Sequence, residues 1–129
     1  MVTAEKQTIR VAVATKGGGL VNQHFGHAKE FQIYEVDDTQ ALFLETRQAT
    51  SYCQGGHGAE ESLNRIVRLL ADCQGVLVSK IGTGPDDRLR EAGIEPVQVY
   101  DAIETAVLEF YQQWRTSSLI INHNQEVSA

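Results

Sequence analysis

Alternating apolar and polar positions mark five short stretches of the chain as β-strands. Ile9–Thr15 alternates large and small side chains, is rich in β-branched residues and stops at three consecutive glycines. Glu30–Val36 and Ala41–Thr46 flank an Asp-Asp-Thr turn, which predicts a β-hairpin. Val76–Ser79 is a nearly continuous apolar run, as expected of a strand that is buried on both faces. Pro96–Tyr100 is predicted to be the last strand, at an edge of the sheet.

A spacing of three and four residues between apolar positions predicts helices in the second half of the chain. The first of them begins near Ala59, and we place its end at Gly75. Its apolar positions are Leu63, Ile66, Val67 and Leu70. Pro85 suits the first position of a helix and Gly93 suits its exit, which predicts a short helix over Asp86–Ala92.

The last helix is predicted from a cap and from a long apolar face. Asp101 is placed to cap it, with Glu104 three residues further on. The apolar face consists of Ile103, Ala106, Val107, Phe110, Tyr111 and Trp114. Residues 1–8 are polar, and beyond the apolar face of the last helix the apolar spacing is lost. We therefore expect a polar extension at 1–8, a folded domain at 9–115 and a disordered tail at 116–129.

The order of these elements predicts the fold class. Three strands precede a helix, and strands and helices then alternate, giving the order βββαβαβα. This order predicts an α/β fold with a mixed sheet and helices packed on its faces, as in a ribonuclease H-like fold. The 129 residues are enough for one such domain and its core.

Composition and charge exclude several classes of protein. Hydrophobic residues make up 42% of the chain and charged residues 22%, with a formal net charge of −6. No apolar run approaches the length of a membrane span or of a signal peptide, so we expect a cytoplasmic protein without membrane contact. The basic residues are scattered, which argues against nucleic acid as a partner. Lys16, Lys29 and Lys80 could still converge locally on an anionic ligand.

Two glycine-rich loops hold most of the residues that could bind a metal. They are Lys16–His27 and Ser51–Gly58, and they contain three of the four histidines and one of the two cysteines. Imidazole and thiolate groups ligate iron and other thiophilic metals, and glycines let a bulky ligand approach the backbone. The candidate cofactor-binding residues are His24, His27, Cys53, His57, Lys16 and Gly26, and the candidate metal ligands among them are His24, Cys53 and His57. One loop follows the first strand and the other precedes the first long helix, so both could open at one end of the sheet.

The same residues also allow interpretations that do not involve a bound metal. Glycine-rich loops often only turn the chain, and Phe25 can anchor its loop to the core as readily as it can cover a cofactor. Cys73 follows the apolar helix face and is expected to be a buried thiol rather than a ligand. The first strand carries no acidic residue, which argues against a metal-dependent nuclease of the same fold. Cys53 and His57 resemble a nucleophile and its base, but no orienting third group accompanies them.

Six runs spread over residues 9–113 carry a resemblance to known proteins: Val11–Lys16, Val21–Val36, Tyr52–Gly56, Asp72–Cys73, Val76–Gly82 and Leu89–Val97. These runs resemble the dinitrogenase iron-molybdenum cofactor biosynthesis family, which includes NifX, NafY and the C-terminal domain of NifB. The resemblance is greatest to the NifB domain.

The resemblance implies a function as well as a fold. It implies a ribonuclease H-like domain that is not an enzyme and that carries iron-molybdenum cofactor, or its iron-sulfur precursor, between nitrogenase cofactor assembly proteins. It also implies cofactor ligation in the His-Phe-Gly loop, which falls on His24 here. Full-length NifB has a radical-SAM domain with a Cys-X-X-X-Cys-X-X-Cys site, which the two separated cysteines of this chain cannot provide. The alternative is a regulatory or protein-interaction domain of a cofactor synthase that does not ligate metal itself.

Overall fold

The computed structural model describes residues 7–49 and 59–128, except for the side chains of Ala59 and of residues beyond 117. The strands are β1 (Ile9–Ala14), β2 (Glu30–Val36), β3 (Ala41–Gln48), β4 (Gly75–Val78) and β5 (Glu95–Gln98). The helices are α1 (Ala59–Leu69), α2 (Thr83–Glu91) and α3 (Ile103–Ser128), with a short 3-10 turn, η1, at Phe25–His27. The predicted α/β class and the predicted order of strands and helices are confirmed.

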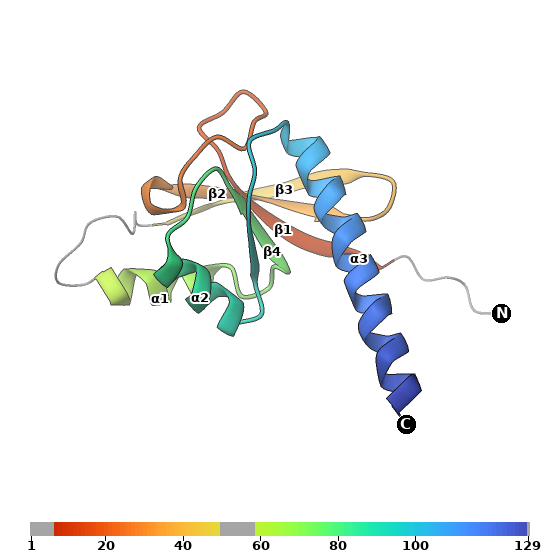
Figure 1. The fold of residues 1–129 in the computed structure, drawn as a ribbon. Helices are drawn as coiled ribbons and strands as arrows, with labels where there is room; N and C mark the ends of the chain where they lie inside the picture. Colours follow the sequence, from red (N-terminus) through yellow and green to blue (C-terminus); the bar gives the residue numbers. More distant parts are fainter. Residues whose placement is uncertain (1–6, 50–58, 129) are drawn as a thin grey trace.

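The five strands form one mixed sheet in the order β3-β2-β1-β4-β5 (Figure 1). The first three strands pair antiparallel, whereas β4 and β5 run parallel to β1. In the centre of the sheet, Val11 lies opposite Tyr34 on one side and Gly75 on the other. A sheet of this kind needs crossovers between its parallel strands, and α1 and α2 are placed in those crossovers.

Alternate residues of the central strands build two cores, one on each face of the sheet. Ala12 and Ala14 face the side covered by α1 and α2, whereas Val11 and Val13 face α3. The first core also contains Leu63, Ile66, Leu70, Val76, Val78, Leu89 and Ile94. The second core also contains Leu77, Ile103, Ala106, Val107, Phe110 and Tyr111. The apolar positions predicted for the first and last helices therefore face the sheet.

The boundaries of two helices differ from the predicted ones. Helix α1 ends at Leu69, not at Gly75, because a turn follows in which the Cys73 N–H donates to the Leu70 carbonyl. Gly75 instead begins β4. Helix α2 begins two residues before Pro85, because the Asp86 N–H already donates to the Gly82 carbonyl. Pro85 fits there because an N–H group in the first helical turn has no partner within the helix.

The start of α3 differs slightly from the predicted cap. The Asp101 carboxylate accepts a hydrogen bond from the Ala102 N–H, and the Ile103 N–H donates to the Gly19 carbonyl at 2.8 Å. Helix α3 continues to Ser128 and extends away from the sheet in Figure 1, although we expected a disordered tail at 116–129. This segment contains no glycine or proline that would stop a helix. The domain limits stay a prediction.

A carboxylate held by two arginines joins three parts of the fold. Asp72, just after α1, accepts hydrogen bonds from Arg10 on β1 at 2.7 Å and from both terminal nitrogens of Arg47 on β3 at 2.7 and 2.9 Å. Arg47 also donates to the Leu69 carbonyl at 2.8 Å. The hydrogen bond from Arg47 is the main reason why the pKa of Asp72 lies well below its usual range. This network fixes the end of β3 against the end of α1.

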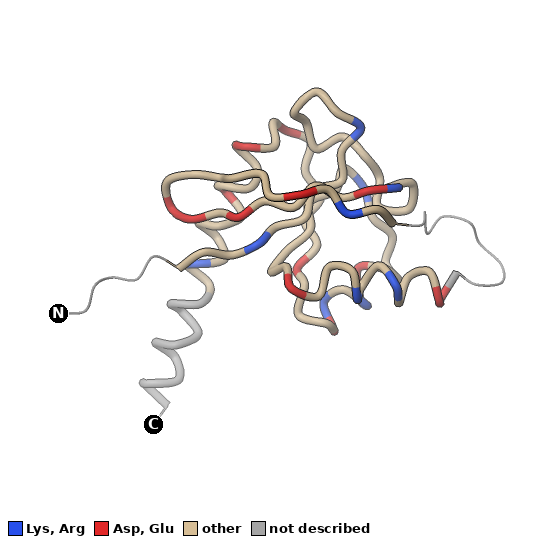
Figure 2. The backbone as a smooth tube through the Cα atoms, turned by 180° about the vertical axis from the view of Figure 1, so that it is seen from behind, with Lys and Arg blue, Asp and Glu red and all other residues tan. Residues whose placement is uncertain are grey.

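Acidic and basic residues are interspersed along the described part of the backbone (Figure 2). Among the described residues, no helix is long and apolar enough to cross a membrane.

Candidate functional site

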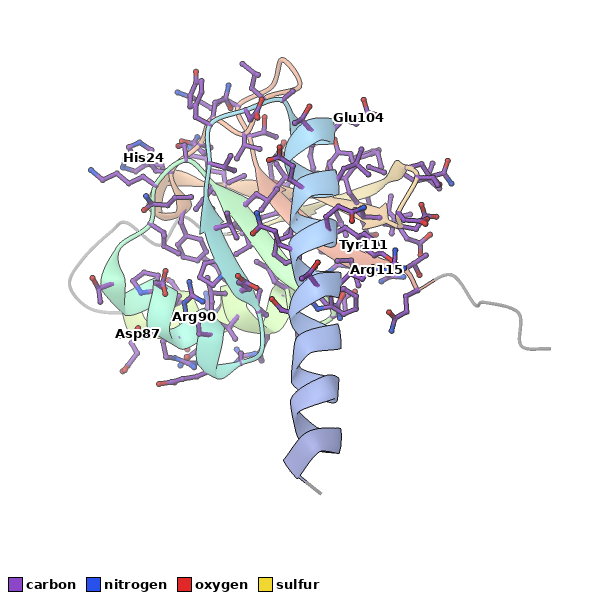
Figure 3. All side chains as sticks on the ribbon, turned by 45° about the vertical axis from the view of Figure 1, so that its right-hand side comes forward. His24, Asp87, Arg90, Glu104, Tyr111 and Arg115 are labelled. Atoms are coloured by element: carbon purple, nitrogen blue, oxygen red, sulfur yellow. The ribbon has the colours of Figure 1, made fainter. Side chains whose placement is uncertain are left out.

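The candidate site lies where the carboxyl ends of two parallel strands meet. Strands β1 and β4 are neighbours, so the segments that follow them leave the sheet at the same edge. One segment turns toward β2 and the other toward α2, and such a divergence commonly leaves a crevice for a ligand. Figure 3 shows His24 at this end of the sheet, away from the labelled residues of α3.

Backbone hydrogen bonds fix the histidine loop to the segment after β4. The Ser79 N–H donates to the Gln23 carbonyl at 3.0 Å, and the Phe25 N–H donates to the Lys80 carbonyl at 2.9 Å. His24 and Lys80 thereby form an isolated parallel bridge. The ring of Phe25 is fully buried, 6.0 Å from the ring of Phe31 between centroids. Of the two roles considered for Phe25, the structure supports the anchor.

The first cavity opens beside this loop and has a volume of about 400 Å³. His24, Gly26 and His27 contribute one wall, and the segment from Lys80 into α2 contributes the other. Its lining residues are His24, Phe25, Gly26, His27, Lys80, Ile81, Gly82, Thr83, Gly84 and Pro85. Both imidazoles are exposed, and their rings stack at a centroid distance of 5.3 Å and an angle of 17°. Exposed imidazoles at a cavity rim can ligate a metal brought in from solution.

The start of α2 adds positive electrostatic potential to the first cavity. Gly82 precedes the helix and has no side chain that could cap its first N–H groups. These groups and the helix dipole favour an anionic ligand. The acidic residue of this turn, Asp86, is held by Arg90 at 2.6 Å. The Ile81 N–H donates to the Gln98 side chain at 2.9 Å, so β5 also positions this wall.

The second cavity, of about 420 Å³, lies on the other side of His27. Its lining residues are Thr15, Lys16, Gly17, Gln23, His27, Lys29, Glu30 and Gln32. Two of the three lysines that were predicted to converge, Lys16 and Lys29, share this cavity, and Lys80 lines the first one. His27 lines both cavities and is the residue that connects them.

The glycine-rich turn after β1 places Lys16 at the second cavity. Gly17, Gly18 and Gly19 have φ angles of +115°, +75° and +72°, a conformation in which other residues would be strained. The Asn22 side-chain oxygen closes this turn by accepting a hydrogen bond from the Lys16 N–H at 2.7 Å. The three glycines therefore determine the path of the chain here.

The other two predicted site residues, Cys53 and His57, lie outside the described residues. The described end of β3 is close to the site, because the Ala49 N–H donates to the Lys29 carbonyl at 2.8 Å. Cys73 is buried, as expected, and burial raises the pKa of its thiol to about 12. No group of three or more metal-ligating side chains is assembled within the described residues.

Four polar residues of the second cavity were not predicted from the sequence: Thr15, Gln23, Glu30 and Gln32. A single polar residue in a loop or on a strand carries no pattern that would distinguish it from a solvated residue. Gly82 and the first residues of α2, Thr83–Pro85, form the opposite wall of the first cavity.

Comparisons with known proteins agree with the resemblance that the sequence carries. The sequence model of the family described as "Dinitrogenase iron-molybdenum cofactor" matches residues 7–113. The chain is 52% identical over 106 residues to the FeMo cofactor biosynthesis protein NifB of Frankia alni, and 42% identical over 119 residues to that of Azotobacter vinelandii. These matches cover 80% and 88% of the chain but only 21% and 24% of the relatives, so the chain spans about a fifth to a quarter of their length.

Two solved structures share the fold at lower sequence identity. The apo form of the orange protein from Desulfovibrio gigas aligns with a TM-score of 0.59 and 21% identity, covering 84% of this chain and 92% of that one. An NMR structure of a Thermotoga protein aligns with a TM-score of 0.52 and 18% identity, covering 74% and 80% of the two chains. At these identities the alignments support the arrangement of strands and helices alone.

Proposed function

This chain belongs to the dinitrogenase iron-molybdenum cofactor family, and on that premise we propose that it carries iron-molybdenum cofactor, or its iron-sulfur precursor, during cofactor assembly. The family and the names of its relatives connect the chain with biosynthesis of this cofactor. As part of the same proposal, the chain is a cytoplasmic, non-catalytic domain that exchanges the cluster with nitrogenase cofactor assembly proteins. The strand order β3-β2-β1-β4-β5, with β2 antiparallel to its neighbours, supports the ribonuclease H-like assignment.

One observation carries the proposal. The exposed imidazoles of His24 and His27 stand at the rim of a cavity of about 400 Å³ that the first turn of α2 and Lys80 complete. Imidazole supplies a ligand for iron, and the ammonium group and the helix start supply positive potential for an anionic cluster. Few protein ligands and an open rim suit a carrier, because the cluster must also be released.

His24 is the first candidate ligand, and His27, Cys53 and His57 are further candidates. His24 is held by the bridge to Lys80 at the cavity rim. Cys53 would supply a thiolate, the usual protein ligand of iron-sulfur clusters. The segment that contains Cys53 begins one residue after Ala49, which is hydrogen-bonded to Lys29 beside the second cavity.

Anaerobic titration tests the proposal directly. The purified protein is mixed with iron-molybdenum cofactor or with its iron-sulfur precursor, and the iron that remains bound after gel filtration is measured. We expect stoichiometric retention by the unchanged protein and loss of retention in His24→Ala. His123→Ala is the matched control, because it removes an imidazole from outside the two glycine-rich loops. Cys53→Ala then tests the proposed thiolate ligand separately.

The alternative function predicts the opposite pattern. If the chain is a regulatory or protein-interaction domain that does not ligate metal, the unchanged protein retains neither cluster. The glycine-rich loops would then be the contacts to an assembly protein, and the His24→Ala substitution would weaken that binding. Retention of cluster by both histidine variants would also reject the proposed ligand, because the rim imidazole would then contribute nothing to binding.

A further inference from the structure

We propose that the second cavity is a separate binding site for a small oxyanion with two or more negative charges. The cavity is distinct from the one that we assign to the cluster, and only His27 lines both. Its cations come from two segments: Lys16 from the glycine-rich turn after β1, and Lys29 from the residue before β2. Because these segments are held by backbone hydrogen bonds, the fold itself brings the two lysine residues to one cavity.

The charges of the cavity are incompletely balanced by protein groups. Within the described residues, no ion pair involves Lys16 or Lys29. The one carboxylate that lines the cavity, Glu30, accepts a hydrogen bond from the Gln48 side chain at 3.1 Å. Two ammonium groups against one carboxylate leave a net positive charge, which favours an anion over a metal cation.

The polar lining defines the chemistry of the ligand further. Gln23 and Gln32 add amide groups that can donate to oxygen atoms, whereas the hydroxyl group of Thr15 is already hydrogen-bonded within the glycine-rich turn. Glu30 reduces the net charge of the lining to about one positive charge, but within the described residues it is not ion-paired with either lysine. An oxyanion with two or more charges can therefore still interact with both ammonium groups, and it does so more strongly than a singly charged anion. Polycarboxylates and inorganic phosphate share this chemistry.

The site would also influence the cluster site. An anion in the second cavity would contact His27 on one side, and a cluster in the first cavity would contact it on the other. Occupancy of one cavity should therefore change the affinity of the other, and this coupling rests on the proposed function. The anion site itself is independent of the cluster, so the two are measured separately.

Isothermal titration calorimetry of the full chain, without cluster and at low ionic strength, tests the site. The probes are citrate, inorganic phosphate and acetate. We expect one site that binds citrate or phosphate roughly tenfold or more tightly than it binds acetate. Whichever of citrate and phosphate binds more tightly shows whether the site prefers a polycarboxylate or a phosphate. The double variant Lys16→Gln/Lys29→Gln should weaken this binding by roughly tenfold or more.

The control is the double variant Arg68→Gln/Arg115→Gln, which changes the net charge equally. Both arginines are exposed and line neither cavity. Equal weakening in both double variants, or binding of citrate and phosphate no tighter than acetate, would overturn the inference. Matching thermal unfolding midpoints show that the lysine variant is folded.

Cluster retention in anion-free buffer separates the two proposals. If the cluster is retained but no anion binds to the free protein, the anion site alone is rejected. If the anion binds but no cluster is retained, the carrier proposal is rejected and the anion site stands.

Discussion

Substituting Gly75 with alanine tests how α3 is held against the sheet. Gly75 begins β4 and lies between β1 and β5, opposite Val11 and Glu95. The ring of Phe110 from α3 occupies the space that a side chain at Gly75 would need. A methyl group at Gly75 would lie 2.5 Å from Cε2 and 3.0 Å from Cε1 of this ring, and closer still to Cζ. Carbon atoms at optimal contact are about 3.5 to 4.0 Å apart, so the ring or the strand must move.

The expected cost follows from overpacking a buried contact. Gly75 is buried, and Phe110 is only 6% exposed, so the ring has little free space into which it can turn. Overpacking of this kind typically costs about 1 to 3 kcal/mol. For a domain of this size, about 2 kcal/mol lowers the melting temperature by roughly 8 °C. We therefore expect Gly75→Ala to lower the free energy of unfolding by about 2 kcal/mol.

Urea unfolding followed by circular dichroism measures this cost. Gly84→Ala is the matched control, because a methyl group there meets no atom within 4 Å and the residue does not have a positive φ angle. It should be neutral or stabilising by about 0.4 to 1 kcal/mol. In a Phe110→Leu background the cost of Gly75→Ala should fall, giving a coupling energy of about 0.5 to 3 kcal/mol. A cost in the original background of less than about 0.5 kcal/mol, or no coupling, would refute the predicted clash.

Two further predictions concern the charge network and the buried thiol. Asp72→Asn should lower the free energy of unfolding by about 1 kcal/mol at pH 7, since the Asp72 side chain is 43% exposed and solvent screens its pairs with Arg10 and Arg47. Because the folded-state pKa of Asp72 is lowered, this contribution is complete above the unfolded-state pKa of about 4 and is lost as the pH falls through the folded-state pKa. Urea unfolding at several pH values should show the difference between the two proteins shrinking in acid, and a constant difference would contradict the assigned network. In a Cys53→Ser protein, Cys73 is the sole thiol. Iodoacetamide at about pH 8 should label Cys73 only after unfolding, because burial raises the pKa of its thiol to about 12. Rapid labelling of the folded protein would disprove this burial.

The sequence predicted the strands and helices well because their signals are local. The hairpin was predicted at Glu30–Val36 and Ala41–Thr46, and the structure places its strands at Glu30–Val36 and Ala41–Gln48. The alternation of apolar and polar residues in a strand can be recognised from neighbouring residues alone. The start of α2 was predicted less well. Pro85 signals a helix start in general, but the hydrogen bond from Asp86 to Gly82 sets the actual one.

Part of the candidate site was also visible in the sequence. The clustering of His24, Gly26 and His27 in one glycine-rich loop predicted a site there, and these residues line the first cavity. The opposite wall could only be suggested, because it depends on the pairing of strands. The contribution of Cys53 and His57 stays a prediction.

The sequence by itself determined which segments are strands and helices, which faces of them are apolar, and which loop carries exposed imidazoles. Each of these properties depends on the types and spacing of neighbouring residues. Only the tertiary structure decided that Lys80 stands beside His24 and that His27 separates two cavities. Those relations arise because the parallel pairing of β1 with β4 brings together the segments that follow them, and no local pattern encodes that pairing.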